Sequence, residues 1–132
     1  MTAPPQIELL GKPHAIILPS YAEREEIYVA WGQVQTGNPM RKYRALAAAI
    51  GLCTRLGRHA EADYVALGCE PLRYGGAVYG YLRDQGATRE QVVTAGMTII
   101  ELVSDALFPR EAEVAAELGK SEASAEPATA SP

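Results

Sequence analysis

Residues 38–57 read NPMRKYRALAAAIGLCTRLG, and no other stretch says more about how the chain folds. Asn38 followed by Pro39 is a strong helix start, because the Asn side chain accepts a free backbone N–H and Pro suits the first helical position. Apolar residues then recur every three or four positions, which is the helical period: Met40, Tyr43, Leu46, Ala47, Ile50 and Cys53. The spacing predicts a helix from about Pro39 to Leu56, with Gly57 as its C-cap. The small side chains of residues 47–49 let another helix approach closely.

The flanking segments carry further helix signals. Capping or proline patterns mark three more starts: Ser20 with Glu23, Pro71 after Glu70, and Thr88 with Gln91. Weaker patterns predict short helices over 60–67 and 110–118. Gly86 closes the helix that begins at Pro71. The glycines inside that helix cost helix propensity, so we expect a neighbouring backbone to lie close to them: Gly75, Gly76 and Gly80.

A β-hairpin is expected ahead of the helices. Residues 6–10 and 14–18 are short apolar runs on either side of the turn signal Gly11-Lys12-Pro13. Because Pro13 lacks an N–H, we expect a loop slightly longer than two residues. A hairpin alone is marginal in water, so it must pack on the helices or add strands from another chain.

The whole chain of 132 residues has the size of one domain, and 48% apolar residues can fill its core. The predicted fold is mainly α: an N-terminal β-hairpin, a bundle of about five helices and a disordered C-terminal tail. Residues 1–5 are a flexible lead, 6–119 the helical domain and 120–132 the Ala/Ser/Pro tail, which lacks large apolar residues.

Composition favours a cytoplasmic protein. No apolar run is long enough to span a membrane, and the first residues lack the basic and apolar regions of a secretory signal. In such a chain, Cys53 and Cys69 are expected to be free, buried thiols rather than a disulfide.

Signals for catalysis are missing. The chain has no dinucleotide fingerprint, phosphate loop or nucleophile elbow. His14 and His59 do not join the cysteines in any standard zinc spacing. Glutamates 23, 25 and 26 are explained by the favourable field at a helix N-terminus. We therefore predict no enzyme activity, no cofactor and no metal.

Charge is segregated along the chain, although the net charge is only −4. Five basic residues and no acidic one lie between positions 41 and 58, whereas 59–119 hold ten acidic and four basic residues. The basic residues are candidates for contact with an acidic partner, which includes the acidic half of another copy: Arg41, Lys42, Arg44, Arg55 and Arg58. Two alternatives stay open, a solvated face whose charges pair within the fold and a nucleic-acid contact.

Three tyrosines within eight residues form a second candidate binding group: Tyr74, Tyr79 and Tyr81. They cannot all face one core stripe of a helix, and tyrosine is common in interfaces. The alternative is a tyrosine-rich edge of the core.

The chain resembles the small tail assembly chaperones of tailed bacteriophages. The likeness covers most of residues 6–108 and is carried by the stretch 7–12, the capped helix at Ser20, and the runs 44–53 and 71–78. The resemblance implies a helical protein that binds the tape-measure protein during tail assembly and then leaves the particle. It also implies that a longer, frameshifted form is common in the family. No site residues transfer one by one.

These observations predict a non-enzymatic protein-binding module, with a long helical partner seated between its middle helices. One alternative is a structural virion subunit, such as a head–tail connector or tail-completion protein. The other is a small DNA-associated regulator that uses the basic helix 41–58, although the acidic pI near 5.2 argues mildly against nucleic acid.

Overall fold

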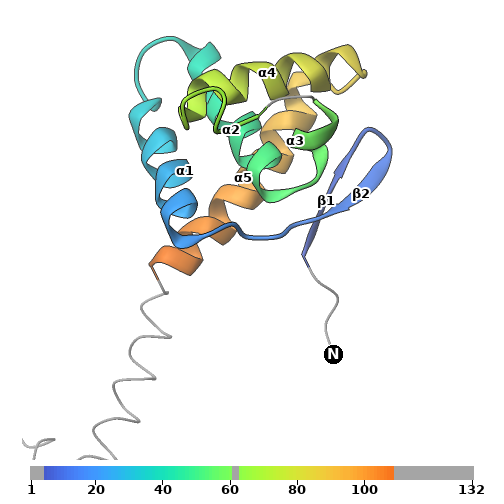
Figure 1. Cartoon of the computed structure of the whole chain (residues 1–132). Helices are drawn as coiled ribbons and strands as arrows, with labels where there is room; N and C mark the ends of the chain where they lie inside the picture. Colours follow the sequence, from blue (N-terminus) through green and yellow to red (C-terminus); the bar gives the residue numbers. More distant parts are fainter. Residues whose placement is uncertain (1–4, 61–62, 109–132) are drawn as a thin grey trace, which may run out of the picture.

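The computed structural model describes residues 5–60 and 63–108. A hairpin of β1 (Gln6–Leu9) and β2 (Lys12–Ala15) comes first (Figure 1). Five helices follow in the described part of the chain: α1 (Tyr21–Gln33), α2 (Pro39–Cys53), α3 (Leu56–His59), α4 (Pro71–Asp84) and α5 (Arg89–Leu107). The mainly α architecture with an N-terminal hairpin is therefore confirmed. The lead up to residue 4, the helix expected over 110–118 and the tail 120–132 lie outside the described residues.

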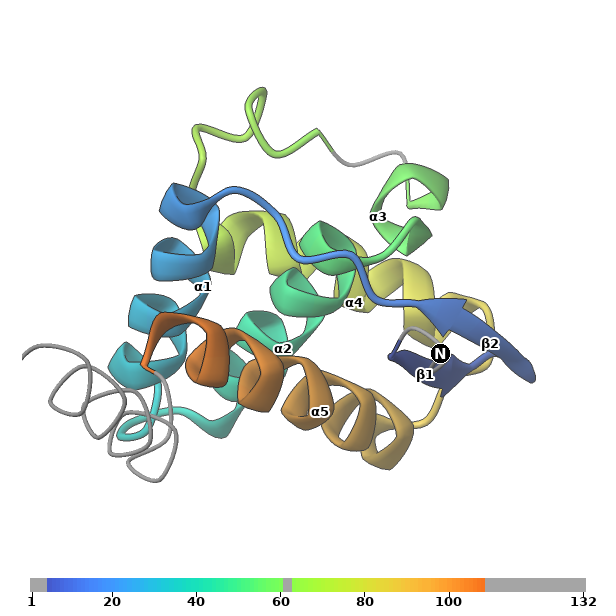
Figure 2. The same ribbon diagram turned by 90° about the horizontal axis from the view of Figure 1, so that it is seen from below.

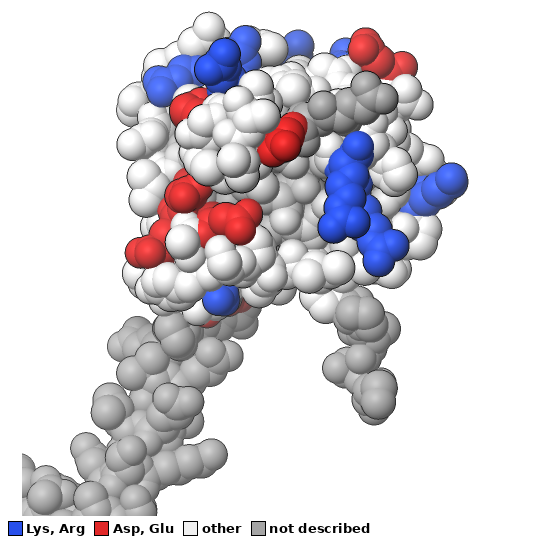
Figure 3. Space-filling model, in the orientation of Figure 1, with Lys and Arg blue, Asp and Glu red and all other residues white. Residues whose placement is uncertain are grey.

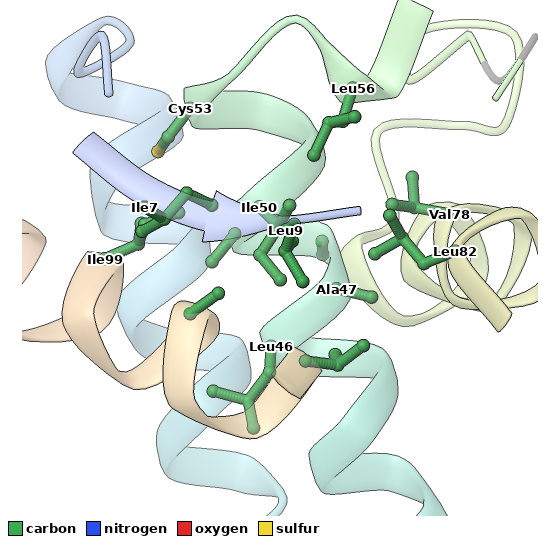
Figure 4. Close-up of a cluster of buried hydrophobic side chains, with 14 of the residues drawn as sticks. Ile7, Leu9, Leu46, Ala47, Ile50, Cys53, Leu56, Val78, Leu82 and Ile99 are labelled. Carbon is green, nitrogen blue, oxygen red and sulfur yellow. The ribbon is translucent and has the colours of Figure 1, made fainter. Parts of the chain in front are cut away.

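Helix α2 is the centre of the bundle, and it contacts α1, α3, α4 and α5 (Figure 2). Its residues 45–51 are all buried. The hairpin closes one side of the core through Ile7 and Leu9, which lie among aliphatic side chains of α2, α4 and α5 (Figure 4). Of the two expectations for the hairpin, packing on the helices or pairing with strands of another chain, the structure shows the first.

The four helix starts that are marked by a capping residue or a proline are correct. The hydroxyl oxygen of Ser20 accepts the N–H of Glu23 at 3.4 Å, and Asn38 Oδ1 accepts the N–H of Met40 at 2.9 Å. Thr88 and Gln91 form the complete reciprocal capping box, with distances of 3.1 and 2.8 Å. Each cap satisfies a backbone donor that the first helical turn leaves free.

The predicted end of the central helix is wrong, because α2 stops at Cys53 rather than Leu56. The Thr54 hydroxyl donates to the carbonyl of Ile50 at 2.6 Å and accepts the N–H of Leu56 at 3.2 Å. The carbonyl of Cys53 accepts the N–H of Ile17 at 2.8 Å. A side chain and a distant segment therefore satisfy the helix end, and α3 starts as a separate turn.

The helix predicted over 60–67 is also wrong in its described part, where residues 64–69 form turns. The carboxylate of Asp63 accepts the N–H groups of Val65 and Ala66 at 3.0 and 3.2 Å. Gly68 then takes a φ of +80°. A local side-chain bond thus competes with helix formation in this stretch.

The glycine prediction holds at one of its three positions. A Cβ on Gly75 would overlap the carbonyl oxygen of Arg44, so glycine lets α4 lie against the backbone of α2. Gly76 meets only the flexible Arg44 side chain, and Gly80 faces open space. Gly57 is not a C-cap; it is buried inside α3 against the hydroxyl of Tyr74.

The hairpin loop is shorter than expected. Leu9 pairs with Lys12, which leaves a two-residue turn of Leu10 and Gly11 with φ angles of +56° and +73°. Positive φ at both positions is the geometry of the favoured tight hairpin turn. Pro13 lies beyond the turn, opposite Glu8. Its missing N–H is tolerated there because both strands of a two-stranded sheet are edges.

Candidate functional site

The five predicted basic residues do not form one surface. Arg41, Lys42 and Arg44 lie in the first turns of α2, whereas Arg55 and Arg58 lie at α3. Between the two groups α2 is buried from Ala45 to Gly51. At 1.5 Å per residue, the nine residues from Arg44 to the end of α2 at Cys53 rise about 14 Å along the helix axis, and Arg55 and Arg58 lie beyond that end. We therefore treat them as two separate basic groups.

Tyr74 belongs to the core rather than to the surface. Its side chain is 3% exposed and lies against Gly51 and Gly57. Its ring meets the edge of the Tyr64 ring at a centroid distance of 5.2 Å. Burial raises the pKa of Tyr74 to about 12. Tyr74 therefore follows the alternative prediction, in which the tyrosines form an edge of the core.

The other two candidate tyrosines are half-buried and lie in different surroundings. Tyr79 stacks on Tyr43 of α2 at 5.9 Å, and the guanidinium of Arg89 lies 5.0 Å from the Tyr43 ring centre. Hydrogen bonding to Tyr79 raises the pKa of Arg89. This stack joins α2, α4 and the start of α5. Tyr81 instead lines a hollow of about 400 Å³ with both histidines of the chain.

The two cysteines are free, as predicted, but only Cys53 is buried. Burial, and after it the charge of Glu23, raises the pKa of the Cys53 thiol to about 12. A buried thiol with a high pKa is a poor nucleophile. Cys69 is exposed, which corrects the expectation that both are buried. Among the described residues, no three His, Cys, Asp or Glu side chains gather as metal ligands.

Helix α1 carries exposed apolar side chains that are not among the basic and tyrosine candidates selected from the sequence. Its buried side consists of Ile27 and Ala30. Three further apolar side chains of α1 face solvent: Tyr21, Tyr28 and Val29. The signal was present in the sequence, since apolar residues occur around the whole circumference of residues 21–33. An amphipathic surface helix would confine them to one stripe.

Two grooves run along α1, one on each side. The groove toward α4 has a volume of about 450 Å³, and its charged lining residues are Glu25, Glu26 and Glu70. The groove toward α5 has a volume of about 430 Å³, and its charged lining residues are Glu101 and Asp105. Every charged residue that lines either groove is therefore acidic.

We define the α1 docking surface as the outward side chains Tyr21, Tyr28 and Val29 together with these two grooves. Phe108 extends it, since its ring lies 5.1 Å from that of Tyr28. Apolar contact area beside carboxylates suits a helix that presents apolar and basic side chains together. In the face that Figure 3 shows, one group of acidic side chains lies over α1, and others lie elsewhere on the face.

Comparison with protein-family models, with characterised proteins and with solved structures finds no match. Within residues 5–60 and 63–108, no helix has the length and apolar character needed to cross a membrane.

Proposed function

We propose that the protein is a non-enzymatic protein-binding module that holds a helix of another protein on the α1 docking surface. The observation that carries the proposal is the outward side of α1, where apolar side chains lie exposed between two grooves whose charged lining is entirely acidic. Exposed apolar groups beside acidic grooves are typical of interaction sites, and the one basic group of α1, Arg24, lies 5.6 Å from the ring centre of Tyr21. The partner helix presents aliphatic or aromatic residues flanked by Lys or Arg.

The resemblance to tail assembly chaperones supports a particular partner, a long helical tape-measure-like protein. Such a protein exposes apolar helix faces until it is assembled, and a small acidic surface that covers them keeps them from aggregating. In this proposal the protein acts in the cytoplasm of the infected host cell and carries no cofactor.

Co-expression with a tape-measure-like protein tests the proposal. The wild-type chain should keep the partner in the soluble fraction, and the double variant Tyr21→Ser/Val29→Ser should leave it in the pellet. The variant Arg41→Ser is the matched control, because it changes an exposed residue outside the surface. A partner that stays insoluble with the wild-type chain contradicts the proposal.

A structural virion subunit is the second candidate, because a permanent neighbour in the particle would cover the same α1 docking surface. Mass spectrometry of finished particles separates the two functions. A chaperone is absent from them, and a connector or tail-completion subunit is present.

The split of the basic residues offers less support for a DNA-associated regulator. The predicted basic helix is buried over its middle, so it presents no continuous basic side to a groove of DNA. A steep loss of duplex binding with added salt, removed by Arg41→Ser/Arg44→Ser, would favour the regulator instead.

A further inference from the structure

A second surface lies between α1 and α3, on the face of the molecule that Figure 3 shows. Its middle is the segment that joins the hairpin to α1, where Ile17 is 60% and Leu18 37% exposed. A groove of about 320 Å³ opens beside Ile17, and its lining includes the apolar side chain of Leu52. The middle of this face is therefore apolar.

Opposite charges flank this apolar strip. Arg55 and Arg58 line the groove on the side of α3, and both are exposed. Figure 3 shows a group of acidic side chains over α1 on the other side. Helix α1 contains Glu23, Glu25 and Glu26, of which Glu25 and Glu26 also line the groove toward α4. The negative charge of Glu23 reaches the groove itself, since it adds to the effect of burial on the pKa of Cys53. In Figure 3 the acidic group over α1 and the basic group on the side of α3 lie apart across mostly uncharged surface, and further basic side chains border the acidic group.

Glu26 also ties the acidic side to its neighbours. The hydroxyl of Tyr64 donates a hydrogen bond to Glu26, and the ring of Tyr64 packs against that of Tyr74, which lines the groove. Burial, together with this hydrogen bond, raises the pKa of Tyr64. The acidic flank is thus held in a fixed place relative to the apolar strip.

We infer that this α1/α3 face, made of the α1 glutamates, Ile17, Leu18, Arg55 and Arg58, binds the same face of a second copy of the chain. A half-turn about an axis along the apolar strip brings the acidic side of one copy onto the basic side of the other. Both flanks are then matched at once, and Ile17 and Leu18 of the two copies meet at the axis. A two-fold interface of this kind is self-complementary and closes at two copies.

Charge complementarity is the reason for choosing a second copy as the occupant. A uniformly acidic or basic partner would meet like charge on one of the two flanks, which costs binding. A second copy meets opposite charge on both. Since the arginines lie outside the α1 docking surface, variants of the arginines separate this inference from the proposed function.

Analytical ultracentrifugation of the full chain over a concentration series tests the inference. The wild type should associate into dimers. The affinity of the dimer should fall as salt rises from about 50 to about 500 mM, because salt screens the flanking charges. The variant Arg55→Glu/Arg58→Glu should raise the dimer dissociation constant at least about tenfold. Arg41→Glu/Arg44→Glu makes the same change in net charge outside the face and should leave the dimer intact.

A charge exchange gives the sharpest result. Glu25→Lys/Glu26→Lys should also be monomeric, and an equal mixture with Arg55→Glu/Arg58→Glu should restore a dimer, because each flank again meets its opposite. Circular dichroism confirms that each variant is folded before mixing. A wild type that is monomeric throughout, a mixture that fails to associate, or species larger than a dimer would overturn the inference.

Discussion

Gly75 of α4 lies directly against the main-chain carbonyl of Arg44 in α2, so close that a Cβ would overlap the carbonyl oxygen. The next residues of α2, from Ala45 onward, are buried, and the small side chain of Ala48 lies close to Gly75. This close approach of two backbones fixes how α4 crosses the central helix. It also turns Tyr74, the neighbour of Gly75, into the core.

Gly75→Ala should therefore destabilise the protein, although alanine is the better helix former. Backbone on both sides cannot give way cheaply, and we expect a loss of at least about 2 kcal/mol in the free energy of unfolding. Gly80→Ala is the matched control in the same helix, since nothing lies within 4 Å of its added Cβ. That change should gain up to about 1 kcal/mol. Urea denaturation measures both, and equal effects would contradict the packing of α4 on α2.

The two thiols should differ in reactivity. In the native protein a thiol reagent should label Cys69, because that thiol is exposed. Cys53 should stay unlabelled, because its thiol is buried and has a pKa raised to about 12. Intact-mass measurement should show one label per chain under native conditions and two in denaturant. Cys69→Ser should abolish native labelling. Rapid labelling of Cys53 in that variant would show that the groove beside Ile17 is open to the core.

Alkaline pH should destabilise the fold through Tyr74. Because burial holds its pKa near 12 rather than 10, the unfolded chain loses this proton first, and stability falls as pH rises from about 10 to about 12. The group adds up to about 1.4 kcal/mol per pH unit to that slope. Tyr74→Phe keeps the ring, removes one titrating group and should lower the slope by that amount, whereas Cys53 and Tyr64, whose pKa values are also raised, account for the slope that remains. Urea denaturation at pH 9 to 11 measures the dependence of stability on pH for both proteins. If Tyr74→Phe and the wild type had the same slope, the Tyr74 hydroxyl would be in contact with water.

Most of the fold could be predicted from local sequence patterns, because each helix start depends on capping interactions between residues close together in the sequence. Asn38 with Pro39, or Thr88 with Gln91, satisfies free N–H groups within a few residues of sequence. The end of α2 was misplaced because it depends on Ile17, which bonds to Cys53 from a segment far away in the chain. No local pattern contains that information.

The candidate site was harder to predict, for the same reason. The basic residues 41–58 look like one face in the sequence, but tertiary packing buries the middle of their helix. Tyr74 reads as an interface residue until Gly51 and Gly57 make room for its ring inside the core. The exposed side of α1 was visible only as a surplus of apolar residues around one helix. Deciding which of them face solvent required the positions of α4 and α5.

The side chains proposed to bind a partner should be nearly neutral for folding. Tyr21 and Val29 are each more than half exposed, so Tyr21→Ser and Val29→Ser should each change the free energy of unfolding by no more than about 0.5 kcal/mol. Binding of a basic amphipathic helix should weaken by at least about tenfold in the double variant. Thermal unfolding and isothermal titration calorimetry report the two quantities separately. A large loss of stability would instead assign these residues to the fold.

The most direct test of the α1 docking surface is an NMR titration of the labelled chain with a tape-measure-like helix. The amide shifts should change over Tyr21–Gln33 and over the groove residues at the start of α4 and the end of α5. The amides of Arg41, Lys42 and Arg44 should stay unchanged. Changes centred on those three basic residues, or no changes at all, would contradict the proposal that α1 holds the partner.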